Sequence, residues 1–232
     1  MPSARNHKEI AEFLFLGGDL CGLDTETVGC NPKKETAPGR AKLWCMTISW
    51  GTDDSVFVPA SEVHYYKQWL ECDRCPKVGT NLYGYDVHVF RNTGIELRGI
   101  VGDTLVMSRL LNPSKLEGHG LKPWAAKLGY DMESFSQMNN VVKHNPEPKA
   151  YKRDGIRDCS QNPSGQTWPV SYTKGAPYCT VSLFKTQFVP LDELWERYPA
   201  RRERVVQYAI QDAKVSRVVF LHLKQKLEES VW

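Results

Sequence analysis

The chain has 232 residues, of which 41% are apolar and 25% charged, which is the composition of a folded globular domain. Its 30 Lys and Arg against 27 Asp and Glu give a formal net charge of +3, so overall charge does not by itself indicate a nucleic-acid partner. No apolar run approaches the roughly 20 residues that span a bilayer, so we expect no signal peptide, membrane anchor or membrane partner. Seven cysteines, an odd number, are typical of reduced thiols in a cytoplasmic protein.

The first part of the chain predicts one helix and then three strands. Apolar positions on one side of the segment 7–16 predict a helix, which Gly17 and Gly18 end. Segments 19–26, 43–50 and 55–58 read as strands, the last two joined by a tight turn at 51–54. Together these strands form a predicted three-stranded meander.

The rest of the chain alternates short strands with helices. The predicted elements are a helix at 61–72, a strand at 77–81, a helix at 86–91, a strand at 100–101, and helices after Asp103 to Leu111, at 120–128 and at about 200–229. Strands first, then strands alternating with helices, predict an α/β fold in which helices pack on a mixed sheet.

Residues 137–189 depart from this pattern. They contain five prolines and little periodicity, so we interpret them as an insertion in a single domain over 1–232, serving as a loop, lid or binding element. Basic and aromatic side chains mix there as on a surface that binds single strands, although a protein partner fits equally well. These side chains are Lys149, Tyr151, Lys152, Arg153, Arg157, Trp168, Tyr172 and Tyr178.

Two acids end the first predicted strand. Asp24 and Glu26 are alternate residues, so they point to the same face and repel each other. A hard divalent cation such as Mg²⁺ or Mn²⁺ would neutralise such a pair. The alternative for this pair alone is a strand end with solvated acids.

Two further acids follow in separate elements. Asn81 ends a predicted strand, and a turn through Gly84 brings Asp86 to a helix start, where it is either a ligand or a helix cap. Tyr208 and Asp212 are four residues apart and so share one helix face. In isolation, such a pair is more often a half-buried aromatic and a solvated acid.

In this order the three pieces resemble the DEDD superfamily of 3′–5′ exonucleases, in its tyrosine-bearing subgroup. Segments 103–111 and 118–129 resemble the proofreading domains of family A DNA polymerases, most of all those of phage-type replicative enzymes. The resemblance covers 19–130 and 190–226. It implies a ribonuclease H-like (DnaQ-like) fold, with helices on both faces of a mixed central sheet.

The resemblance also implies the site. Asp24, Glu26, Asp86 and Asp212 would hold two Mg²⁺ (or Mn²⁺) ions, with Asp24 bridging them, and Tyr208 would orient the attacking water. Because the unperturbed pKa of tyrosine is about 10, Tyr208 is expected to act by hydrogen bonding rather than as a general base. Thr25 and Asn81 would line the pocket of the terminal nucleotide.

The implied function is hydrolysis of DNA from single-stranded or frayed 3′ ends, releasing nucleoside 5′-monophosphates in phage-type replication or proofreading. Only residues 213–232 follow Asp212, so we expect no polymerase domain here, and a separate DNA polymerase subunit is a candidate partner. A phage protein would act in the cytoplasm of a bacterial host. The alternatives are an exoribonuclease of the ribonuclease D type and a non-catalytic module that binds DNA ends or a polymerase.

Several other residues have more ordinary interpretations. Asp103 is expected to cap a helix, and His119 to hold a turn. Cys72-Asp73-Arg74-Cys75 is a lone CxxC motif without two further zinc ligands at a supporting spacing or a thioredoxin-like helix start, so we interpret it as structural thiols. Lys33, Lys34, Arg40 and Lys42 either contact the phosphate backbone or belong to a solvated loop.

Overall fold

The computed structural model describes residues 6–28, 38–114, 117–134, 140–144, 150–151, 180–181 and 184–230. The chain divides into two compact units, one made of Met1–Met138 and Pro190–Trp232 and the other of Asn139–Val189. Among the described residues, no helix combines the length and the apolar character needed to cross a bilayer.

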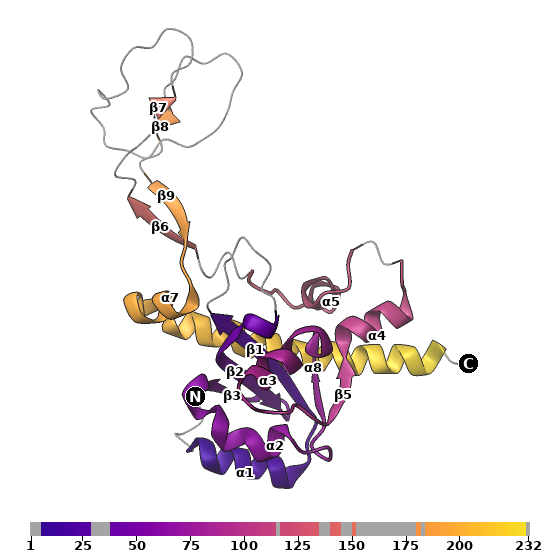
Figure 1. Cartoon of the computed structure of the whole chain (residues 1–232). Coiled ribbons are helices and arrows are strands. Elements are labelled where there is room, and N and C mark those ends of the chain that lie inside the picture. Colours follow the sequence, from indigo (N-terminus) through magenta and orange to yellow (C-terminus); the bar gives the residue numbers. More distant parts are fainter. Residues whose placement is uncertain are drawn as a thin grey trace. The chain divides into compact units, whose positions relative to one another are not determined.

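The first unit contains a mixed sheet of five strands (Figure 1). They are β1 (Cys21–Val28), β2 (Lys42–Trp50), β3 (Asp54–Pro59), β4 (Lys77–Gly79) and β5 (Ile100–Asp103). Their order is β3-β2-β1-β4-β5, with β1, β2 and β3 antiparallel and β4 and β5 parallel to β1. The predicted meander and mixed sheet are confirmed.

Helices pack against both faces of this sheet. The α-helices of the first unit are α1 (His7–Gly17), α2 (Lys67–Leu70), α3 (Val87–Asn92), α4 (Thr104–Leu111), α5 (Leu121–Lys127), α7 (Leu191–Arg197) and α8 (Arg202–Ser230). Shorter helical turns are η1 (Pro38–Arg40), η2 (Ala60–Tyr66), the π-helical η3 (Leu82–Asp86) and η4 (Pro199–Arg201). Helix α1 ends where Gly18 adopts a φ of 65°, as the two glycines predicted.

The structure differs from the predicted elements in two places. The helix predicted at 61–72 is a 3₁₀ segment, η2, followed by the single short turn α2. Aromatic and β-branched residues are weak helix formers, and Val63, Tyr65 and Tyr66 concentrate there. Helix α7 was not predicted.

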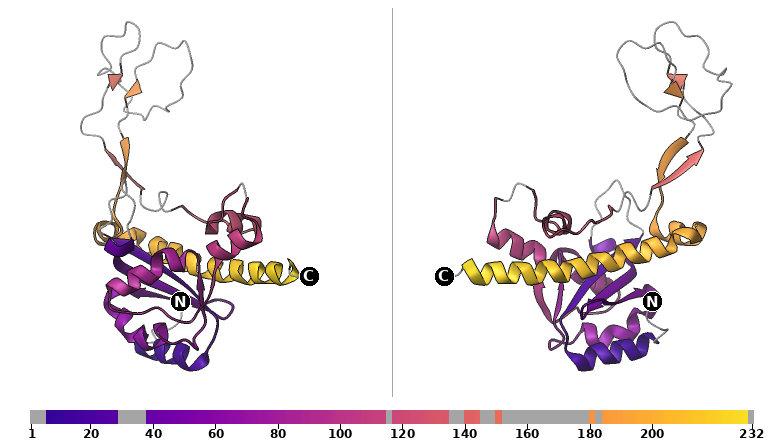
Figure 2. Two further views of the ribbon diagram at one scale, coloured as in Figure 1. Left: turned by 45° about the vertical axis from the view of Figure 1, so that its right-hand side comes forward. Right: turned by 180° about the vertical axis from the view of Figure 1, so that it is seen from behind.

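One face of the sheet lies under α8, which crosses the strands in the view from behind (Figure 2). Gly22 of β1 makes this close approach possible, because a Cβ built there would come within 2.1 Å of the carbonyl oxygen of Ala213. The Thr47 hydroxyl donates a hydrogen bond of 2.8 Å to the Ala209 carbonyl of α8. Thus α8 lies close against the backbone of β1 at Gly22, and the Thr47 side chain of β2 adds a hydrogen bond to it.

The opposite face carries the main hydrophobic core. Helices α1, α2 and α3 and the segment η2 cover it, and Leu14, Leu23, Ile48, Trp69 and Phe90 are fully buried within it. Leu23 precedes Asp24, so successive residues of β1 serve the two different faces.

The second unit contains two short antiparallel strand pairs. Strand β6 (Asn140–His144) pairs with β9 (Phe184–Phe188), and β7 (Ala150–Tyr151) pairs with β8 (Thr180–Val181). Most basic and aromatic residues singled out in the insertion lie outside the described residues: Lys149, Lys152, Arg153, Arg157, Trp168, Tyr172 and Tyr178. A single-strand-binding role for the insertion therefore stays a prediction.

Candidate active site

Three carboxylates meet on the α8 face of the sheet. Carboxylate oxygens of Asp24, Glu26 and Asp212 lie within 4.8 Å of one another. Asp24 and Glu26 share a face because they alternate along β1, and the close packing of α8 on Gly22 brings Asp212 to them. Strand β1 and helix α8 thus bring together acids that lie near opposite ends of the sequence.

Tyr208 lies one helical turn before Asp212 on α8 and is only 8% exposed. Its hydroxyl donates a hydrogen bond to the Asp212 carboxylate. Burial raises the pKa of Tyr208 above its usual value of 10, and the negative charges of Glu26, Asp212 and Asp24 raise it further. The phenol is therefore neutral at physiological pH and available as a hydrogen-bond donor.

Asp86 is the last residue of the π-helical turn η3 and is 3% exposed. Its side chain does not cap α3, so the capping alternative is wrong. Instead, it accepts a hydrogen bond of 2.6 Å from the Thr25 hydroxyl of β1. Burial raises its pKa to about 7 despite this hydrogen bond, which lowers it.

Asp86 is outside the group whose oxygens fall within 4.8 Å of one another among the described residues. Its charge nevertheless reaches the group, because it raises the pKa values of Asp24 and Glu26. The structure therefore brings three of the four predicted acids into one cluster and places the fourth beside it.

Burial and mutual repulsion together make it unfavourable for the three clustered acids and Asp86 to be ionised at the same time without a cation. Burial raises the pKa of Asp24 well above its ordinary value, and Glu26, Asp212 and Asp86 add to the rise. Burial, followed by Asp212 and Asp86, raises the pKa of Glu26 to about 8. Burial also raises the pKa of Asp212 to about 6, against the lowering effects of Tyr208 and the Lys122 ammonium. Divalent cations with a preference for oxygen ligands fit this donor set, because they would replace the protons.

The turn that carries Asp86 is held by a buried carboxylate. Asp103, 2% exposed, accepts backbone hydrogen bonds from Asn81 (2.9 Å) and Tyr83 (3.2 Å). It also accepts one from Leu105 (3.0 Å), as the predicted cap of α4. The sequence predicted the cap but not the contacts of Asp103 with η3, because no local signal marks a partner 20 or more residues away.

The two residues predicted to contact the terminal nucleotide, Thr25 and Asn81, differ in their exposure to solvent. Thr25 is 8% exposed, and its hydroxyl donates to Asp86. Asn81 is exposed and has a φ of 65°. A Cβ built at Gly84 would come within 2.4 Å of the Asn81 side-chain oxygen, so this glycine leaves room for the amide. Substrate contact by either residue stays a prediction.

Hydroxyl groups that were not singled out in the sequence connect the elements around the site. Thr80 lies 2.6 Å from the Thr104 hydroxyl and 3.0 Å from the Ser216 hydroxyl, which ties the end of β4 to α4 and α8. Ser108 Oγ accepts from Trp124 Nε1 at 2.7 Å and lies 2.9 Å from His119 Nδ1. His119 is thus part of a structural network, as its position in a turn predicted.

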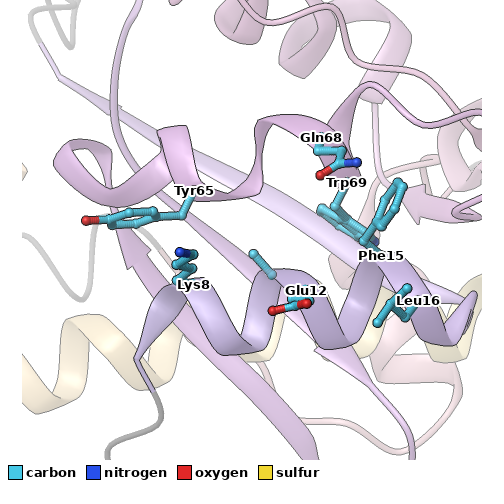
Figure 3. Close-up of a pocket in the computed structure, with 8 residues that line it drawn as sticks. Lys8, Glu12, Phe15, Leu16, Tyr65, Gln68 and Trp69 are labelled. Atoms are coloured by element: carbon cyan, nitrogen blue, oxygen red, sulfur yellow. The ribbon is translucent and has the colours of Figure 1, made fainter.

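Of the cations predicted near the first motif, Arg40 and Lys42 are exposed at η1 and β2, whereas Lys33 and Lys34 lie outside the described residues. A pocket of about 480 Å³ lies elsewhere, between α1 and the η2–α2 segment (Figure 3). Lys8 and Tyr65 form its polar end, and Phe15, Leu16 and Trp69 its apolar end. Because α1 covers the face opposite α8, this pocket is separate from the acids.

The chain has sequence relatives among DNA polymerases, although no family model matches it. Over 132 residues it is 29% identical to DNA polymerase I A, chloroplastic/mitochondrial, of Arabidopsis thaliana, a match that covers 51% of this chain and 12% of that protein. It is 26% identical over 145 residues to DNA polymerase I B, mitochondrial, of Oryza sativa subsp. japonica, covering 54% of this chain and 13% of the relative. The chain thus spans about an eighth of the length of these curated relatives.

Solved structures share the fold at low identity. The POL domain of Pol1 from M. smegmatis, in complex with DNA primer-template and dNTP, matches with a TM-score of 0.56 and 13% identity over 95% of this chain and 26% of that chain. Escherichia coli RNase D matches with a TM-score of 0.55 and 13% identity over 97% of this chain and 44% of its own. Brucella melitensis NrnC matches with a TM-score of 0.51 and 16% identity over 91% of this chain and 75% of that chain. The chain is therefore similar in sequence to part of two DNA polymerases, and it shares its fold with the solved structures of Pol1, RNase D and NrnC.

Proposed function

We propose that the protein is a divalent-metal-dependent 3′–5′ exonuclease of the tyrosine-bearing subgroup. The observation that carries this proposal is the cluster of Asp24, Glu26 and Asp212, with the Tyr208 hydroxyl hydrogen-bonded to one of its carboxylates. The order of these residues along the chain matches the resemblance found in the sequence.

Asp24, Glu26, Asp86 and Asp212 would hold two Mg²⁺ or Mn²⁺ ions. Such ions, when bound, activate a water and stabilise the departing 3′ oxygen in hydrolysis of a phosphodiester. Tyr208 is a neutral phenol that donates a hydrogen bond, so its role is to orient water rather than to remove a proton. Thr25 fixes the orientation of Asp86.

DNA is the proposed substrate, at single-stranded or frayed 3′ ends, with nucleoside 5′-monophosphates as products. The support is the sequence similarity to two DNA polymerases, whereas the likeness to RNase D concerns the fold alone. A role in phage-type replication or proofreading, alongside a separate polymerase subunit, extends the same proposal.

The direct test is degradation of a 5′-labelled single-stranded DNA oligomer with Mg²⁺ or Mn²⁺, resolved by product length. We expect a ladder that shortens from the 3′ end, disappears with EDTA and is absent in the Asp24→Ala/Glu26→Ala variant. Glu203→Ala is the matched control, because this exposed acid also lies on the helix of Asp212 but outside the cluster. A double variant that still cleaves would overturn the assignment.

Substrate class is tested with DNA and RNA oligomers of the same sequence. Faster shortening of the DNA strand is expected. Faster shortening of the RNA strand would replace the proposal with an exoribonuclease of the ribonuclease D type. Tight binding of a DNA end without cleavage at saturating Mn²⁺ would indicate a non-catalytic binding module instead.

A further inference from the structure

The CxxC motif lies in a tight turn between α2 and β4. The amide of Cys75 donates a hydrogen bond of 3.4 Å to the carbonyl of Cys72, which closes a four-residue β-turn. The ends of such a turn are less than about 7 Å apart between Cα atoms, and disulfides span about 4.4–6.8 Å. The Cys75 thiol itself donates to the carbonyl of Phe15 at 3.7 Å. The backbone therefore holds the two cysteines within the range of Cα separations that a disulfide spans.

The two thiols differ in access to solvent. Cys72 is half-buried at the surface, whereas Cys75 is 1% exposed. Burial opposes ionisation of Cys72, but hydrogen bonds from Cys75 and Arg74 bring its pKa below the usual value of 9.0. Burial, with the adjacent Cys72, raises the pKa of Cys75 to about 11. One accessible thiol that ionises readily and one buried neighbour form the arrangement of an attacking and a resolving cysteine.

A fully buried lysine lies beneath this turn. The Lys77 ammonium donates to the carbonyls of Cys75 (2.8 Å) and Cys72 (3.3 Å), and its nitrogen lies 4.6 Å from the centre of the Trp69 ring. Burial lowers its pKa to about 8, and its positive charge in turn lowers the pKa of Cys75. A buried ammonium is costly to maintain, so its placement against both cysteine residues is a specific feature of this turn.

We propose that Cys72 and Cys75, which the sequence alone indicated to be structural thiols, form a redox-active dithiol that exchanges with small disulfides such as glutathione disulfide. The Cys72 thiolate attacks one sulfur of the small disulfide, whose S–S bond breaks and releases one small thiolate. The Cys75 thiolate then attacks the Cys72 sulfur and expels the second small thiolate. The protein loses two electrons and two thiol protons, and the small disulfide gains both as two small thiols.

This site is distinct from the acidic cluster and does not depend on nuclease activity. The turn nevertheless leads directly into β4, where Lys77 pairs with Cys21 of β1. Asp24 follows Cys21 by three residues on the same strand. The turn is thus next to the strand that carries two of the acids.

The experiment uses the full chain incubated with glutathione disulfide, alkylated, and digested with trypsin. Cleavage after Arg74 separates the two cysteines, so a 72–75 disulfide appears as peptide 68–74 joined to peptide 75–77. We expect this joined pair in the wild type and its loss on reduction. In Cys75→Ser, glutathione is expected to stay attached to Cys72, whereas in Cys72→Ser attachment at Cys75 should fall at least about tenfold because that thiol is buried.

A rate measurement separates a reactive dithiol from two ordinary thiols that happen to be close. Alkylation of Cys72 at neutral pH is expected to slow about threefold in Arg74→Gln, because the side-chain hydrogen bond from Arg74 that favours the thiolate is lost. Arg91→Gln, an exposed arginine on α3, is the matched control and should leave the rate unchanged. Absence of the joined peptides in excess glutathione disulfide, or equal glutathione attachment in both serine variants, would overturn the proposal.

Discussion

The two faces of the central sheet are built from different residues. Towards α1 and α3, the strands present Leu23, Met46 and Ile48, all fully buried in the hydrophobic core. Towards α8, the same strands present Gly22, Thr47 and the acids of the site. The apolar face supplies stability through buried surface, whereas the α8 face keeps unfavourable charges close together. Alternate residues of the same strands therefore serve stability on one face and chemistry on the other.

The largest effect is expected from filling the space at Gly22. In Gly22→Val, the side chain would collide with the Ala213 carbonyl, because even a Cβ would come within 2.1 Å of that oxygen. Helix α8 must then move away and take Tyr208 and Asp212 with it. We expect loss of detectable cleavage together with a lower melting temperature, measured by the oligomer assay and by calorimetry. Unchanged activity would contradict the close contact of α8 with β1.

A matched change on the opposite face separates stability from chemistry. Ile48→Ala removes a fully buried side chain and is expected to lower the free energy of unfolding by about 2–5 kcal/mol. The acids are left in place, so kcat per folded molecule should be unchanged below the melting transition. Denaturant unfolding measures the first quantity and single-turnover cleavage the second. A large fall in kcat without a loss of stability would show that the two faces are not separable.

Tyr208→Phe removes one hydroxyl from the α8 face and little packing. We expect cleavage to slow by about tenfold, which corresponds to the loss of one hydrogen bond of about 1.4 kcal/mol in the transition state, while the melting temperature changes little. The comparison is made under single-turnover conditions with saturating Mg²⁺. An activity equal to wild type would remove Tyr208 from the mechanism.

Asn81 distinguishes a side-chain role from a backbone role. Asn81→Gly keeps the left-handed φ of 65° accessible, whereas Asn81→Ala adds strain of about 1 kcal/mol. If the amide binds the terminal nucleotide, both variants should raise KM several-fold, and only alanine should also lower stability. A KM raised in Asn81→Ala alone would mean that the turn, rather than the amide, is what matters.

The smallest expected effect is a pH dependence of stability in the metal-free protein. The folded-state pKa values of Asp212, Asp86 and Glu26 are raised to about 6, 7 and 8. Protonated acids therefore stabilise the fold at low pH, and this contribution is lost as pH rises through these values. With EDTA, we expect the melting temperature to fall by a few degrees between about pH 5 and 8. In Asp24→Asn/Glu26→Gln, the melting temperature should depend less on pH. A wild-type melting temperature that rises over this pH range would contradict the prediction.

The sequence was sufficient for the parts of the site that depend on local periodicity. Alternation along a strand placed Asp24 and Glu26 together, and helical spacing placed Tyr208 above Asp212. Contact between these two pairs was expected only from the resemblance, because periodicity does not show which helix packs on which strand. The approach of α8 depends on Gly22, whose role becomes visible only beside Ala213.

The turn around Asp86 shows what sequence patterns miss. The π-helical turn η3 is held by Asp103, and Asp86 itself is held by Thr25. Each of these partners lies in another strand, so no window of local sequence contains the information. The CxxC turn differs, because Lys77 lies within five residues of both cysteines, and yet only the folded turn shows that its ammonium donates to their carbonyls.

The most direct test of the central account is calorimetric titration of the metal-free protein with Mn²⁺ near neutral pH. We expect Mn²⁺ to bind saturably and to release protons, because carboxyl groups with raised pKa values must ionise to bind the metal. Binding should be lost in Asp24→Ala/Glu26→Ala and retained in Glu203→Ala. Wild-type protein that binds no Mn²⁺ at millimolar concentration, or a double variant that binds it equally well, would contradict the account.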